Sequence, residues 1–183
     1  MKKEFIKRLL SSAILIPIAF FFIIKGSFFF NFFLLICFII TSYEWNMMSK
    51  KKTYNIFGHM FLLFSFVCSY LVYDSRAGLY IFLGILLICI STDIGGYIFG
   101  KLLKGPKLTK ISPNKTYAGV FGGYLLSIII SNSYMKYIDQ NFELEEFLLV
   151  ITISTISQIG DITVSYFKRL SKIKNTGEII PGH

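Results

Sequence analysis

Long runs of apolar residues constrain this chain more than any other feature of its sequence. A helix needs roughly 17 to 25 apolar residues to cross a hydrocarbon layer of about 30 Å. Six runs approach that length: 9–24, 28–43, 56–73, 79–99, 117–134 and 147–166. A soluble core of 183 residues could not hide 20 Phe and a mean hydropathy of +0.63. We therefore expect an all-α polytopic transmembrane helix bundle of about six spans, with residues 1–183 forming a single membrane domain.

The first two runs are shorter than the others. Each would cross only with the help of flanking residues or of local thinning of the bilayer, so a tight helical hairpin is an alternative. Four basic residues precede the first run, as in a signal peptide, but no small-x-small cleavage site follows it. We expect an uncleaved helix here.

The distribution of basic residues predicts the orientation of the bundle. With the N-terminus inside, 16 of the 19 Lys and Arg residues fall on the inner side. These are Lys2, Lys3, Lys7, Arg8, Lys50, Lys51, Lys52, Lys101, Lys104, Lys107, Lys110, Lys115, Lys168, Arg169, Lys172 and Lys174. This asymmetry predicts a multi-pass protein of a bacterial-type cytoplasmic (inner) membrane with its N-terminus in the cytoplasm. Anionic membrane lipids then account for the net charge of +9, and no nucleic-acid partner is expected.

A carboxylate lies inside the fourth apolar run. Asp93 follows Ser91 and Thr92, about one and a half turns from the inner end of this run. A carboxylate in hydrocarbon is costly and usually faces a partner or a watery cavity, although a snorkelling interfacial residue is the alternative. The pairs Gly96/Gly100 and Gly119/Gly123 have the spacing that lets helices approach closely, and packing is their expected role.

The loop that follows this run has the composition of an oligophosphate site. Over residues 105–116 it carries lysines, hydroxyl residues and two prolines next to the start of a helix. Lysine ammonium groups, hydroxyls and free backbone N–H groups can together bind phosphate. The segment Ser112-Pro113-Asn114 would equally well end one helix and begin the next, so both interpretations stand at this point.

The last apolar run carries a second carboxylate. Asp161, Ser165 and the cations Lys168 and Arg169 follow one another at spacings of three to four residues and share one helical face. Mg²⁺ on Asp161 would neutralise phosphate oxygens while the two cations hold further phosphate charge, as nucleotidyl transfer requires. The alternative is a helix end whose cations complement the helix dipole.

These residues resemble the phosphatidate cytidylyltransferase (CDP-diglyceride synthetase) family, whose signature has the form S-x-x-K-R-x4-K-D-x-G-x3-P-G-H-G-G-x-x-D-R-x-D. The signature positions present in this chain are Ser165, Lys168, Arg169, Lys174, Gly177, Pro181, Gly182 and His183. The preceding Gly160-Asp161, the loop from Lys107 to Thr116 and the segment 93–97 are also similar to the family. The resemblance spans about residues 91–183.

The resemblance implies a nucleotidyltransferase of phospholipid biosynthesis. In that family, a phosphatidic acid phosphate oxygen attacks the α-phosphorus of CTP, releasing pyrophosphate and forming CDP-diacylglycerol with Mg²⁺. A carboxylate corresponding to Asp161 binds the metal with the later Asp of the D-R segment. Three departures stand out: Lys174 is followed by Asn175, Ala118 replaces an acidic residue, and the chain stops at His183. A chain truncated within the signature would lose charge neutralisation at the transferred phosphoryl group.

The expected roles follow from these patterns. Asp161, Lys115, Lys168 and Arg169 are the expected catalytic residues, and Asp161 and Asp93 the expected Mg²⁺ ligands. The expected substrate-binding residues are Lys107, Lys110, Ser112, Asn114, Thr116, Ser165, Lys174 and His183. The expected partners are CTP, phosphatidic acid and membrane lipids, with a homodimer left open. Two alternatives stand beside the enzyme: a non-catalytic remnant of it, and a small ion-coupled transporter using Asp93 and Asp161.

Overall fold

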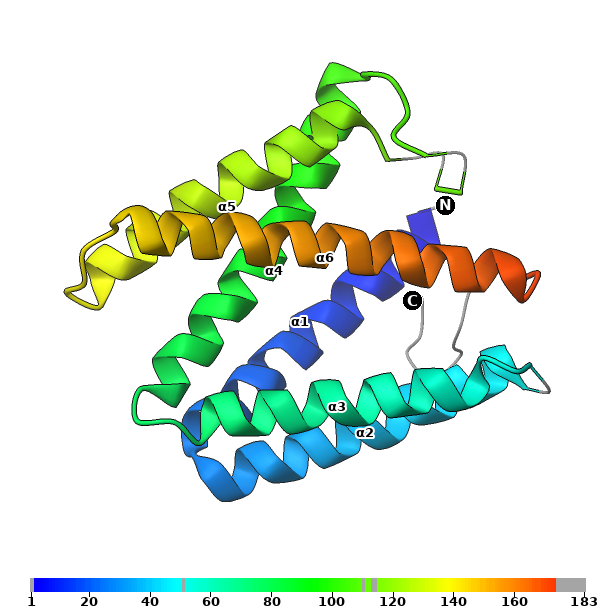
Figure 1. Ribbon diagram of the computed structural model, residues 1–183, viewed down its shortest axis with the longest axis horizontal. Helices are drawn as coiled ribbons and strands as arrows, with labels where there is room; N and C mark the ends of the chain where they lie inside the picture. Colours follow the sequence, from blue (N-terminus) through cyan, green and yellow to red (C-terminus); the bar gives the residue numbers. More distant parts are fainter. Residues whose placement is uncertain (1, 51, 110, 113–114, 174–183) are drawn as a thin grey trace. The chain divides into compact units, whose positions relative to one another are not determined.

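The computed structural model describes residues 2–50, 52–109, 111–112 and 115–173, and its regular elements there are all α-helices. Side-chain positions are described from Ile14 onward, except at Ser27. The helices are α1 (Lys2–Lys25), α2 (Ser27–Ser49), α3 (Asn55–Tyr73), α4 (Gly78–Leu103), α5 (Tyr117–Tyr137) and α6 (Leu144–Leu170) (Figure 1). A helix satisfies its backbone hydrogen bonds internally, which lipid demands of any single spanning segment. The prediction of an all-α bundle is confirmed.

Five of these helices, α2 to α6, are long and apolar enough to cross a membrane. Helix α1 adds a shorter apolar segment, Ile14–Lys25, within its described side chains. The helices extend beyond the apolar runs, so α2 reaches Ser49 and α6 reaches Leu170. The flanking residues thus supply the length that the short second run lacks. The chain is a membrane protein of about six spans.

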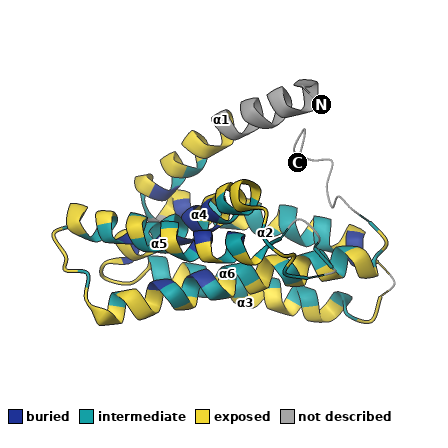
Figure 2. Ribbon diagram, turned by 90° about the horizontal axis from the view of Figure 1, so that it is seen from above, coloured by how far each residue is buried: buried dark blue, intermediate teal, exposed yellow. Residues whose placement is uncertain are grey.

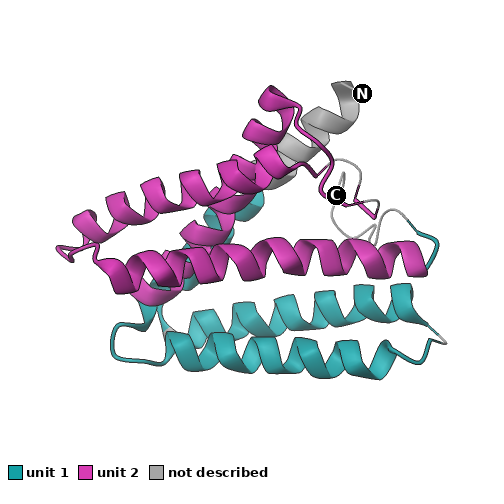
Figure 3. Cartoon of the chain, turned by 45° about the horizontal axis from the view of Figure 1, so that its top comes forward, with its two compact units in different colours: residues 1–79, 171–183 teal, residues 80–170 magenta. Residues whose placement is uncertain are grey.

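The first compact unit contains α1, α2 and α3 (teal in Figure 3). Gly26 alone separates α1 from α2, and its φ of 111° is a conformation that residues with a Cβ rarely adopt. At this break the Tyr73 hydroxyl donates a hydrogen bond to the Ile23 carbonyl at 2.6 Å, and its ring stacks on Phe30. Tyr73 therefore satisfies a carbonyl at the end of α1 and ties α3 to both other helices of the unit.

The second compact unit contains α5, α6 and α4 from Tyr80 onward (magenta in Figure 3). Its buried side chains are mostly hydroxyls, and large apolar side chains such as Phe121 and Ile156 are exposed. Figure 2 colours the ribbon by burial and shows that exposed residues recur along every helix. The buried hydroxyl residues are Ser91, Thr92, Ser127, Ser131 and Ser154. Small residues inside and large apolar residues outside are typical of helices that pack in lipid.

Helices α4 and α5 approach so closely that glycine is required between them. A Cβ added to Gly119 would lie 2.7 Å from the Gly96 carbonyl oxygen, and one added to Gly123 would lie 3.0 Å from the Thr92 carbonyl oxygen. The packing role predicted for the glycine pairs of these helices is therefore confirmed. This backbone contact forms one wall of the site described next.

Candidate functional site

A pocket of about 260 Å³ lies among the three helices of the second unit. The beginning of α5 contributes to it together with the C-terminal halves of α4 and α6. Its lining residues are Thr92, Asp93, Gly96, Tyr97, Lys115, Thr116, Gly119, Val120, Gln158 and Asp161. Residues from all three sequence segments expected to carry chemistry therefore meet at one place.

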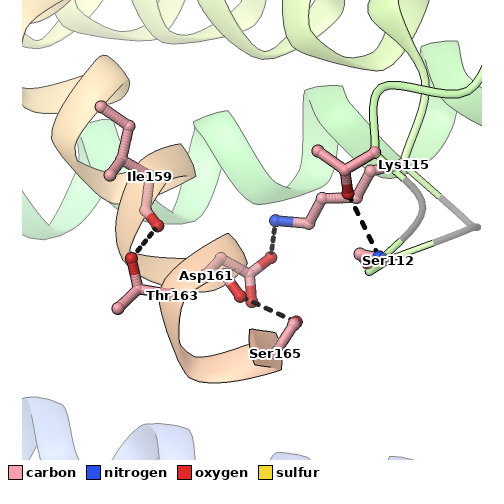
Figure 4. A network of polar contacts seen from close by, with 7 residues as sticks. Ser112, Lys115, Ile159, Asp161, Thr163 and Ser165 are labelled. Atoms are coloured by element: carbon pink, nitrogen blue, oxygen red, sulfur yellow. Dashed lines mark hydrogen bonds and ion pairs between the residues drawn. The ribbon is translucent and has the colours of Figure 1, made fainter. Parts of the chain in front are cut away.

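Lys115 and Asp161 form an ion pair in this pocket (Figure 4). The Lys115 side chain is 25% exposed and that of Asp161 is 56% exposed, so both remain open to a ligand. Asp93 reaches the same pocket from α4. The pocket thus holds two carboxylates and one ammonium group, with a formal charge of about −1 if all three are ionised.

Lys115 owes its position to a loop that folds back on the start of α5. The Leu108 N–H donates to the Lys115 carbonyl at 2.8 Å, and the Lys115 N–H donates to the Ser112 carbonyl at 3.1 Å. Lys107 and Thr116 form an isolated antiparallel bridge. Thr116 then caps α5, accepting a hydrogen bond from the Gly119 N–H at 3.1 Å. Because of this loop, the Lys115 side chain and the positive end of the α5 dipole both lie at the pocket.

Four of the predicted site residues line the pocket: Asp93, Lys115, Thr116 and Asp161. Five others are described but do not line it: Lys107, Ser112, Ser165, Lys168 and Arg169. The Ser165 hydroxyl donates to the Asp161 carbonyl at 2.8 Å, one turn back on its own helix (Figure 4). The substrate roles expected of these five residues stay predictions. Lys110, Asn114, Lys174 and His183 lie outside the described residues.

Gln158 is a pocket residue that was not predicted from the sequence. It precedes Asp161 by three residues on α6 and lines the same pocket. The spacing itself was a usable signal, because residues three apart share a helical face. The predicted residues of that face all lie from Asp161 toward the C-terminus, where the cations are, whereas Gln158 lies on the N-terminal side of Asp161.

The donor set of the pocket suits a hard cation. No group of three or more His, Cys, Asp or Glu side chains gathers in the described part of the chain. Mg²⁺, however, commonly binds proteins through one or two carboxylates and takes its remaining ligands from water and substrate phosphates. Asp93, Asp161 and the amide oxygen of Gln158 are oxygen donors of that kind. The residues present therefore fit Mg²⁺.

Comparison with known proteins gives a consistent picture. A family model described as "Cytidylyltransferase family" matches residues 54–183, a range that includes every pocket residue. The chain is 43% identical over 114 residues to a phosphatidate cytidylyltransferase of Staphylococcus epidermidis and 39% identical over 114 residues to one of Staphylococcus aureus. Each alignment covers 61% of this chain and 44% of the relative, so the chain spans less than half of these relatives. No solved structure matches the chain.

Proposed function

We propose that this chain, which belongs to the cytidylyltransferase family, forms the membrane-embedded core of a CTP:phosphatidate cytidylyltransferase. The relatives described above carry that name. One observation supports the proposal most: Asp93, Lys115 and Asp161 come from three separate motifs and line one pocket. A carrier of simple ions would not need a lysine-rich loop at its pair of carboxylates.

The proposed reaction joins the two substrates at phosphorus. A phosphate oxygen of phosphatidic acid forms a bond to the α-phosphorus of CTP, and the bond between that phosphorus and the bridging oxygen to the β-phosphate breaks. Pyrophosphate leaves with the bonding electron pair. The phosphate nucleophile is already anionic, so positioning and charge stabilisation matter more than a general base.

The pocket residues divide that work by charge. The Lys115 ammonium and the N-terminus of α5 face the phosphate groups and offset their negative charge. Asp93 and Asp161 would hold Mg²⁺, which supplies further neutralisation of the phosphate oxygens when bound. A pocket of about 260 Å³ is at the small end for ligand sites, so it takes the reacting phosphates rather than the whole nucleotide and lipid.

The residues outside the pocket have proposed roles at the membrane surface. Lys168 and Arg169 lie in the last turn of α6, about 11 Å along the helix from Asp161. At that distance they would bind the outer phosphates of CTP or an anionic headgroup. This arrangement goes with a cytoplasmic N-terminus and a bacterial inner membrane, which the basic inner loops support. A homodimer is compatible with this assignment.

A pyrophosphate-release assay tests the proposal. The purified chain in detergent is mixed with CTP, phosphatidic acid and Mg²⁺, and pyrophosphate should appear only when all three are present. Asp161→Asn should abolish release, because a carboxylate that would bind Mg²⁺ is lost. Asp139→Asn is the matched control, since Asp139 lies outside the pocket and its φ of 55° is one that Asn tolerates. Background release from well-folded protein would overturn the assignment for this chain.

A further inference from the structure

A buried hydrogen bond connects α4 to α6 beside the pocket. The Thr92 hydroxyl donates to the Ser154 hydroxyl at 2.9 Å, and the two side chains are 2% and 0% exposed. The Gln158 amide extends the contact with a long bond of 3.5 Å to the same Ser154 oxygen. Three polar side chains from two helices are thus joined at the pocket wall.

The neighbouring buried hydroxyls behave differently. Ser91 bonds to the Leu87 and Ile88 carbonyls of its own helix, and Ser127 bonds to the Tyr124 carbonyl of its own helix. A hydroxyl in a membrane helix can satisfy itself in this way. Thr92 and Ser154 instead bond to each other, so their bond fixes one helix relative to another.

The position of this bond relates it to both carboxylates. Thr92 immediately precedes Asp93 on α4. On α6, Ser154, Gln158 and Asp161 are separated by four and three residues and therefore lie along one face. Thr92 and Gln158 also line the pocket that Asp93 and Asp161 share.

We infer that the Thr92–Ser154 hydrogen bond is a positioning contact, which sets the rotation of α4 against α6 so that Asp93 and Asp161 face one pocket. A side-chain group lies about 5 Å from its helix axis, so a rotation of about 20° moves it by about 2 Å. Misplacement by about 1 Å already costs catalysts about a hundredfold in rate. The consequence for turnover rests on the proposed function, whereas the positioning itself does not.

Cross-linking measures the positioning without any turnover. In a variant with Cys37, Cys68 and Cys89 changed to Ala, Asp93→Cys and Asp161→Cys place two thiols at the pocket. A short bis-methanethiosulfonate reagent should join them within one chain, and mass spectrometry follows the rate. Thr92→Val should lower that rate about threefold or more, the factor that corresponds to an average hydrogen bond between membrane helices. Thr92→Ser keeps the hydroxyl and should restore the rate.

Matched controls separate this bond from the loss of any buried hydroxyl. Ser127→Ala and Ser91→Ala remove buried hydroxyls that bond within their own helices, and both should leave the rate unchanged. Ser154→Ala should match Thr92→Val, and the double variant should be no slower than either single variant. Additive effects, or a parental rate in Thr92→Val, would overturn the inference. The inference would also be overturned if Thr92→Val and Ser154→Ala failed to yield folded protein while Ser127→Ala stayed monodisperse, because the bond would then serve folding.

The same variants keep the two proposals distinct. If no pyrophosphate is released but cross-linking follows the expected pattern, the result would count against the proposed enzyme activity and would still support the positioning contact. Where release is detected, Thr92→Val should lower kcat with little change in KM for CTP, and Thr92→Ser should restore kcat. A change confined to KM would assign Thr92 to substrate binding instead.

Discussion

Replacing Gly122 by alanine should destabilise the second unit, although alanine is the better helix former. An ideal Cβ on Gly122 of α5 would meet the Cβ, Cγ and Cδ2 atoms of Phe99 on α4, with the last at 2.6 Å. Ordinary carbon contacts are about 3.5 to 4.0 Å, so the helices would have to separate by roughly 1 Å. Phe99 offers little relief, because its Cβ belongs to the rigid start of the side chain.

The magnitude follows from the same contact. Overpacking a well-packed interior costs about 1 to 3 kcal/mol, against a helix-propensity gain from Gly to Ala of about 1 kcal/mol or less. For a chain of this size each kcal/mol changes Tm by about 2 to 4 °C. The net cost is then up to about 2 kcal/mol, and we expect Gly122→Ala to lower Tm by up to about 8 °C.

Gly160→Ala is the matched comparison. It makes the same substitution inside α6, where an added Cβ would meet no atom within 4 Å. Its Tm should therefore stay the same or rise slightly. Thermal unfolding in detergent can be followed with a maleimide dye that reacts with Cys37, Cys68 and Cys89 as they become exposed. Equal Tm values for the two alanine variants would refute the close approach of α4 and α5.

Three further predictions concern single contacts. Lys115→Met should change the free energy of unfolding by less than about 1 kcal/mol, because its ion pair is partly exposed. The same variant should lower kcat/KM about tenfold or more, because contacts to phosphate are lost. A thermal melt and the pyrophosphate assay check the two effects, and a large change in Tm would contradict the first. Thr116→Ala should cost about 1 kcal/mol through loss of the α5 cap, and Thr116→Ser should restore the Tm. Tyr73→Phe should cost about 0.5 to 1.5 kcal/mol by removing the bond to Ile23, with the exposed Tyr70→Phe as the control in the same melt.

The spans were predictable because apolar run length reports directly on lipid. Helix ends were not, since residues such as Glu44 and Asn46 interrupt the apolar run before Ser49 without ending α2. A helix can continue into the polar interface, where such side chains are solvated. The same applies to α4, which continues past Phe99 to Leu103.

The site was predictable as a set of segments and not as a set of contacts. Three loop lysines were equivalent in the sequence, and only the fold-back of the loop onto α5 selects Lys115 as the partner of Asp161. Ser165 shares a face with Asp161, yet its hydroxyl bonds to its own helix. Helical spacing predicts which residues share a face, but which of them reaches a partner depends on the neighbouring helix.

The glycine contact between α4 and α5 also limits how this pocket can change over evolutionary time. Gly119 lines it beside the Gly96 carbonyl oxygen, which an added Cβ would approach to 2.7 Å, so there is no room at Gly119 for a larger side chain to alter its shape. Any adaptation to a different headgroup or nucleotide would have to come from positions with replaceable side chains, such as Tyr97, Val120 and Gln158. Random mutagenesis selected for a new substrate should therefore yield changes at those three positions and leave Gly119 intact.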